Sequence, residues 1–168
     1  TNNMTKKTLE NKKVFIYKIR ALISNFMFRY DLITGSYQKS TTILCYHSFT
    51  KSKFRYSVDP QTFERQILKL SKYAEFIKLS DINANTSVNR KKSRLILTID
   101  DGYQSVKNIL PITQKYNIPV TLFVLSNPSK ANRQELETSE KLMSIDDINM
   151  LHSQGWEIGC HSATHPNL

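Results

Sequence analysis

Short apolar runs alternate with amphipathic segments along most of the chain. The runs are rich in β-branched and aliphatic residues, as buried strands are. We predict five strands, at residues 41–46, 76–79, 95–99, 120–125 and 156–160. Strands that alternate with helices are typical of a parallel sheet or barrel with helices outside it, so the pattern indicates an α/β fold.

Three segments between the apolar runs have helical spacing and helix-terminal residues. Asp59 suits an N-cap and Pro60 the first helical turn of the first segment. The second helix is expected over residues 105–116. The third begins at Ser144, which has an Asp three residues later as in a capping box, and it ends at Gly155.

Residues 14–33 mix apolar and basic positions and predict a partly amphipathic helix. Charged and polar residues interrupt it, so it lacks the roughly 18 to 20 uninterrupted apolar residues of a membrane span. Two interpretations stay open: a helix packed on the protein's own surface, or one that contacts a membrane surface or a partner. We predict a basic N-terminal helical segment over residues 1–40 and a folded domain over residues 41–168.

The formal net charge is +10, from 24 Lys and Arg against 14 Asp and Glu. Such an excess can attract nucleic acid, an anionic membrane or an acidic polymer. Much of it lies in residues 6–29 and 90–94, beside no nucleic-acid-binding motif, so we predict no nucleic-acid partner. Cys45 and Cys160 form no CxxC pair, which indicates neither a disulfide framework nor a cysteine zinc site.

Carboxylates and imidazoles follow two different predicted strands. Asp100 and Asp101 come directly after the third strand, and His161 and His165 follow the fifth. Chemistry in such folds collects at the carboxyl ends of parallel strands. Two His and one carboxylate can bind a divalent metal and leave positions open for water and substrate, so the pattern favours a metal site. From the residues alone, either carboxylate could be the ligand.

Several motifs together resemble the polysaccharide deacetylases of the NodB-homology type. Residues 97–103, Leu-Thr-Ile-Asp-Asp-Gly-Tyr, are similar to the family's first motif, and residues 159–168, Gly-Cys-His-Ser-Ala-Thr-His-Pro-Asn-Leu, to its second. Residues 118–124 resemble the strand between them. Residues 43–49, Ile-Leu-Cys-Tyr-His-Ser-Phe, are similar to the branch that includes poly-N-acetylglucosamine deacetylases. The resemblance covers residues 41–168.

The resemblance implies a fold and a set of roles. The fold would be an incomplete (β/α) barrel of the polysaccharide deacetylase type, preceded by the basic helix. Asp100 would be the general base, while Asp101, His161 and His165 would hold a divalent metal, usually Zn²⁺ in this family. The activity implied is hydrolytic deacetylation of an N-acetylglucosamine polymer.

The resemblance also implies where the enzyme acts and which parts of it these residues lack. Such an enzyme would act in the cell envelope or outside the cell, and any signal peptide would lie upstream of Thr1. Later family motifs, an Arg-containing segment and a Leu-x-x-His, would lie after Leu168, so these residues alone would be an incomplete enzyme. The alternative is a catalytically silent module that binds metal or glycan.

Overall fold

The computed structural model describes residues 40–52, 54–83, 92–131, 136 and 139–166. The expected helix over residues 14–33 lies outside them, and the domain boundary at residue 40 stays a prediction. Within the described ranges, no helix combines the length and the apolar character that crossing a membrane requires.

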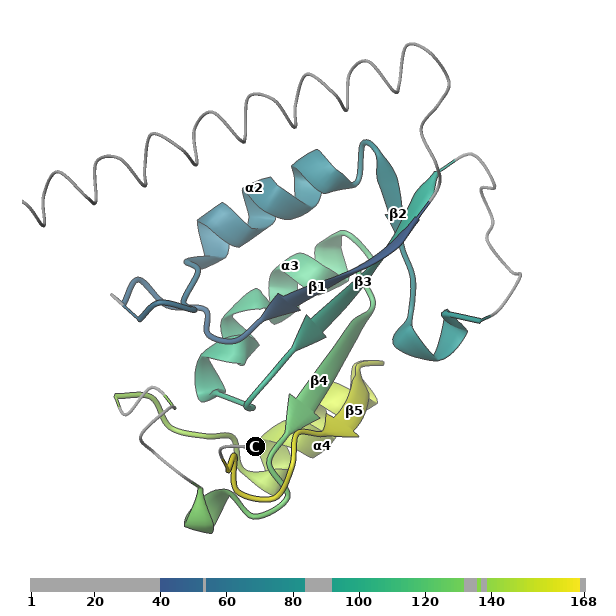
Figure 1. The fold of residues 1–168 in the computed structure, drawn as a ribbon. Coiled ribbons are helices and arrows are strands. Elements are labelled where there is room, and N and C mark those ends of the chain that lie inside the picture. Colours follow the sequence, from purple (N-terminus) through teal and green to yellow (C-terminus); the bar gives the residue numbers. More distant parts are fainter. Residues whose placement is uncertain (1–39, 53, 84–91, 132–135, 137–138, 167–168) are drawn as a thin grey trace, which may run out of the picture. The chain divides into compact units, whose positions relative to one another are not determined.

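Five parallel strands form the sheet (Figure 1). β3 (Ser93–Ile99) pairs with β1 (Thr41–Tyr46) along one side. Its other side pairs first with β2 (Ala74–Phe76) and then with β4 (Val120–Val124), and β5 (Glu157–Cys160) pairs with β4. The parallel sheet confirms the α/β fold class and brings the strands' carboxyl ends to one edge. Barrel character stays a prediction.

Among the described residues, three α-helices and three short 3-10 helices connect the strands. The N-cap Asp59 accepts a hydrogen bond from the Thr62 backbone N–H, as expected for the first helix. Ser144 and Asp147 form the capping box of the last one. In chain order the helices are α2 (Pro60–Leu70), η1 (Leu79–Asp81), η2 (Gln104–Ile109), α3 (Leu110–Lys115), η3 (Pro128–Lys130) and α4 (Ile145–Ser153).

The core lies between the central strands and the helices. Phe63 and Ile67, one turn apart on α2, are fully buried in the same cluster as Leu97 of β3 and Leu122 of β4. Leu151 brings α4 into this cluster. Fully burying an aliphatic or aromatic side chain contributes roughly 1.5–3 kcal/mol, so this cluster fixes the strands whose ends carry the predicted site.

Two predicted elements have different bounds in the structure. The strand expected at 76–79 is β2, which ends at Phe76. The Leu79 backbone N–H donates to the side-chain carboxylate of Glu157 rather than to a backbone carbonyl of a neighbouring strand. The helix expected over 105–116 begins as the 3-10 helix η2 and becomes α-helical only from Leu110. Pro111 explains this, because it lacks the N–H that an α-helix needs and its ring would clash with the carbonyl four residues earlier.

β1 is also less buried than its apolar sequence predicts. It forms one end of the strand order and pairs only with β3 among the described strands. Ile43, in its middle, is 51% exposed. The prediction of a buried strand at 41–46 was therefore wrong on burial, since an edge strand has a neighbour on one side only.

Candidate functional site

A tight turn after β3 separates the two adjacent carboxylates. Asp101 and Gly102 both have left-handed backbones, with φ of 70° and 76°. The Gly102 N–H donates to the Asp100 carbonyl at 2.9 Å, and a Cβ at Gly102 would lie 3.0 Å from a methyl carbon of Val124. The turn leaves Asp101 only 4% exposed, while Asp100 is half-buried. The two neighbours therefore face different surroundings.

The end of β5 positions both histidines. The His161 N–H continues the sheet ladder by donating to the Val124 carbonyl at 2.8 Å. The chain then turns, with Ser162 and His165 at φ of 62° and 56°. The Ser162 hydroxyl accepts a hydrogen bond from the His165 backbone N–H at 3.1 Å. Ser162 thus holds the turn that returns the second imidazole toward the first.

The structure brings together the three predicted metal ligands. The Oδ1 atom of Asp101 lies 3.4 Å from His161 Nε2 and 3.5 Å from His165 Nε2. The two imidazole centroids are 5.3 Å apart. One ligand atom from each residue lies within 4.8 Å of the others. We call Asp101, His161 and His165 the buried cluster.

The buried cluster fits a divalent cation. Asp101 Oδ1 is buried and makes no hydrogen bond to any described part of the chain, which is costly for a carboxylate oxygen. Burial raises the pKa of Asp101, although His47, His165 and His161 act in the opposite direction. One carboxylate and two imidazoles are the donor set of many zinc sites. A cation shared by these atoms would satisfy the buried oxygen and favour the ionised carboxylate.

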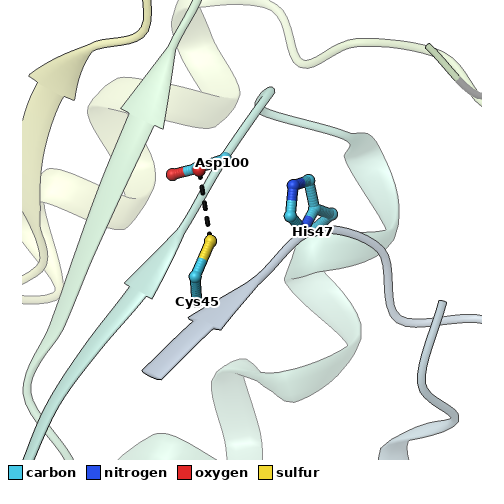
Figure 2. A group of neighbouring side chains, drawn as sticks. All are labelled: Cys45, His47 and Asp100. Carbon is cyan, nitrogen blue, oxygen red and sulfur yellow. Dashed lines mark hydrogen bonds between the residues drawn. The ribbon is translucent and has the colours of Figure 1, made fainter. Parts of the chain in front are cut away.

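Asp100 lies in a second group of side chains, with Cys45 and His47 (Figure 2). The Asp100 N–H donates to the Tyr46 carbonyl at 2.9 Å, so the register of β1 and β3 sets this group. The Cys45 thiol donates to Asp100 Oδ2, with the two atoms 3.2 Å apart. Cys45 is exposed as a residue, but partial desolvation of its thiol, and then the hydrogen bond and charge of Asp100, raise the pKa of Cys45 to about 11. The thiol is therefore protonated at neutral pH.

This second group was missed by the sequence interpretation. Both cysteines are free, and Cys45 lies within 4.8 Å of two other ligand atoms. The sequence feature that points to this group is a Cys-x-His pattern, Cys45 and His47, at the end of the strand at 41–46. Had β1 been placed beside β3, the parallel register would have set Cys45 and His47 next to Asp100. We call Cys45, His47 and Asp100 the rim cluster.

The sequence around the buried cluster is similar to that of known proteins. Residues 87–168 match the family model described as polysaccharide deacetylase. A bifunctional xylanase/deacetylase from Pseudobutyrivibrio xylanivorans is 29% identical over 91 residues, which are 53% of this chain and 13% of that protein.

Solved structures share the fold. IcaB from Ammonifex degensii is similar with a TM-score of 0.61 and 25% identity over 74% of this chain. The Streptococcus pyogenes deacetylase PplD, solved with acetate, has a TM-score of 0.57 and 20% identity over 75% of this chain. The match spans 53% of IcaB and 57% of PplD, about half the length of each. With both motifs inside the matched segment, residues 87–168 belong to the polysaccharide deacetylase family.

Proposed function

We propose that the chain is part of a metal-dependent deacetylase that hydrolyses N-acetyl groups on an N-acetylglucosamine-containing polysaccharide. The observation that carries the proposal is the buried Asp101 carboxylate facing two imidazoles, directly beside the more accessible Asp100. The family match supports a polysaccharide substrate. The choice of an amino sugar rests on the resemblance of residues 43–49 to the poly-N-acetylglucosamine branch.

Asp101, His161 and His165 would hold the cation, with Zn²⁺ as the proposed ion. When bound, the cation supplies Lewis acidity that polarises the acetyl carbonyl and a water molecule. Its charge would also favour the ionised form of Asp101, against the effect of burial. The three side chains lie on the segments that follow β3 and β5, so the pairing of both strands with β4 helps to set their spacing.

Asp100 is proposed as the general base. It is half-buried, directly follows β3 and lies close enough to Asp101 to raise the pKa of that carboxyl, which supports a role toward a water molecule at the buried cluster. Asp100 takes the proton of that water as the oxygen attacks the acetyl carbon. The proton that Asp100 has taken is passed on to the leaving nitrogen as the amide C–N bond breaks, which releases acetate and leaves a free amine on the sugar. The Cys45 thiol, as a donor to Asp100, limits which way the carboxylate turns.

The proposal also includes the location of the enzyme and the surfaces that it contacts. An acetylated surface polysaccharide would place it in the cell envelope or outside the cell. A net charge of +10 suits an anionic envelope, and residues 14–33 are the candidate membrane-surface contact. The alternative of a catalytically silent metal- or glycan-binding module makes a different prediction for the experiment below.

The test compares two variants of the longest natural protein that contains this sequence. Asp100→Asn should keep the metal but lower acetate release from an N-acetylglucosamine oligomer by about a hundredfold or more, because the base is lost. His161→Ala should lose both metal and activity. His152→Ala is the matched control: this histidine is exposed near the end of α4, and both properties should stay unchanged.

Acetylated xylan in a parallel assay separates amide from ester hydrolysis. Near wild-type acetate release by Asp100→Asn would contradict the assignment of the base. A wild-type protein that binds metal but releases no acetate from either polymer would favour the silent module.

A further inference from the structure

We propose that the rim cluster, Cys45, His47 and Asp100, is a second metal site that binds a thiophilic divalent cation such as Cd²⁺ or excess Zn²⁺. The site is distinct from the buried cluster, with which it shares no residue. The inference about its effect on catalysis rests on the proposed function of Asp100, whereas the binding itself does not.

The backbone fixes the three side chains of the rim cluster. Cys45 is paired with Thr98 in the register of β1 and β3, and His47 and Asp100 each follow directly after those strands. The hydrogen bond from the Asp100 N–H to the Tyr46 carbonyl extends the pairing by one step. The three residues thus lie on adjacent chain segments at one end of a rigid strand pair (Figure 2).

The donor atoms suit a soft or borderline cation. A thiolate, an imidazole and a carboxylate are all common zinc ligands, with bonds of about 2.0 to 2.3 Å. One ligand atom from each of the three residues lies within 4.8 Å of the others, and the thiol and carboxylate atoms are already 3.2 Å apart. Small rotations of the side chains would bring all three onto one ion. Thiolate ligation favours Zn²⁺ and Cd²⁺ over Mg²⁺ or Ca²⁺.

The rim cluster is also accessible and partly preorganised. Cys45 is exposed, and His47 and Asp100 are half-buried, so a cation can enter without opening the core. The His47 ring stacks on Tyr56, with centroids 4.9 Å apart, which restricts its orientation. Binding replaces the S–H bond of Cys45 by a sulfur–metal bond and releases the proton to solvent.

Occupation of the rim cluster would inhibit the proposed reaction. Asp100 cannot take a proton from water while its oxygen is bound to a cation, because the same lone pairs serve both purposes. Excess thiophilic metal should therefore inhibit the enzyme at concentrations above those that fill the buried cluster. Mg²⁺ should not inhibit in this way.

The binding test uses cadmium alone as the probe, in the longest natural protein that contains this sequence. Titration of the His161→Ala variant, in which the buried cluster lacks a ligand, should give the ultraviolet charge-transfer band of a cadmium–thiolate bond. Adding Cys45→Ser should abolish the band, and adding His47→Ala should weaken cadmium binding at least about tenfold. Cys160→Ser is the matched control, because Cys160 is also free and exposed but lies outside the rim cluster.

The results of these experiments test the rim site and the proposed function separately. A thiolate band that persists in Cys45→Ser and disappears in Cys160→Ser, or no band at all, would overturn the rim site. The absorption titration needs no activity, so it is independent of whether the protein is a deacetylase. A Cys45-dependent band without inhibition of acetate release would support the rim site and contradict Asp100 as the base.

Discussion

The buried cluster and the rim cluster share one turn of the chain but lie in opposite surroundings. Asp101 is 4% exposed and lies against two imidazoles from the segment that follows β5. Asp100, one residue earlier, faces the thiol of the edge strand β1. The left-handed backbone at Asp101 separates them. One turn thus gives two adjacent carboxylates different neighbours, as the proposed roles of ligand and base require.

Substitution of the glycine in the turn after β3 should have the largest effect on stability. Gly102→Ala should lower the free energy of unfolding by about 2–3 kcal/mol, because alanine is strained at a φ of 76° and its Cβ would lie 3.0 Å from Val124. Gly155→Ala is the matched control, with a φ of 89° but no heavy atom within 4 Å, and should cost only about 1–2 kcal/mol. Urea denaturation measures both. Equal losses would show that the close approach to Val124 adds nothing.

The reactivity of Cys45 sharpens the description of the rim cluster. Because the pKa of this thiol is raised to about 11, its thiolate fraction grows only as the pH approaches that value, and at pH 8 it is small. An ordinary thiol has a pKa of about 8.5, so Cys45 should react with iodoacetamide about tenfold more slowly at pH 8, after allowing for the greater nucleophilicity of its thiolate. Asp100→Asn should speed the reaction, because the carboxylate contributes to the raised pKa.

Peptide mass spectrometry distinguishes the alkylation of Cys45 from that of Cys160. If Cys45 reacts at the rate of a small free thiol in the wild-type protein, and Asp100→Asn leaves that rate unchanged, the hydrogen bond between Cys45 and Asp100 does not control the thiol.

The sequence predicted the parts of the fold that local chemistry determines. The parallel α/β arrangement, the N-cap at Asp59, the capping box at Ser144 and the left-handed Gly155 follow from periodicity and helix-terminal residues, and all are confirmed. The conversion of η2 into α3 could have been predicted from Pro111, which excludes one hydrogen bond of an α-helix.

Features that depend on strand order could not be predicted in the same way. An apolar run has the same sequence whether its strand lies at the edge or in the centre, so the exposure of Ile43 was missed. The rim cluster was missed for the same reason, since Cys45 and Asp100 become neighbours only when β1 pairs with β3. The buried cluster was easier to predict from the sequence. Its two histidines lie in one motif, and the family resemblance grouped them with Asp101.

The most direct test of the central claim is the position of bound zinc. Crystals of the longest natural protein that contains this sequence, grown with one equivalent of Zn²⁺, would be measured on both sides of the zinc absorption edge. The proposed metal site requires one anomalous peak at about 2.0–2.2 Å from ligand atoms of Asp101, His161 and His165. An anomalous peak on Cys45 and His47 with the buried cluster empty, or no peak at either cluster, would contradict it.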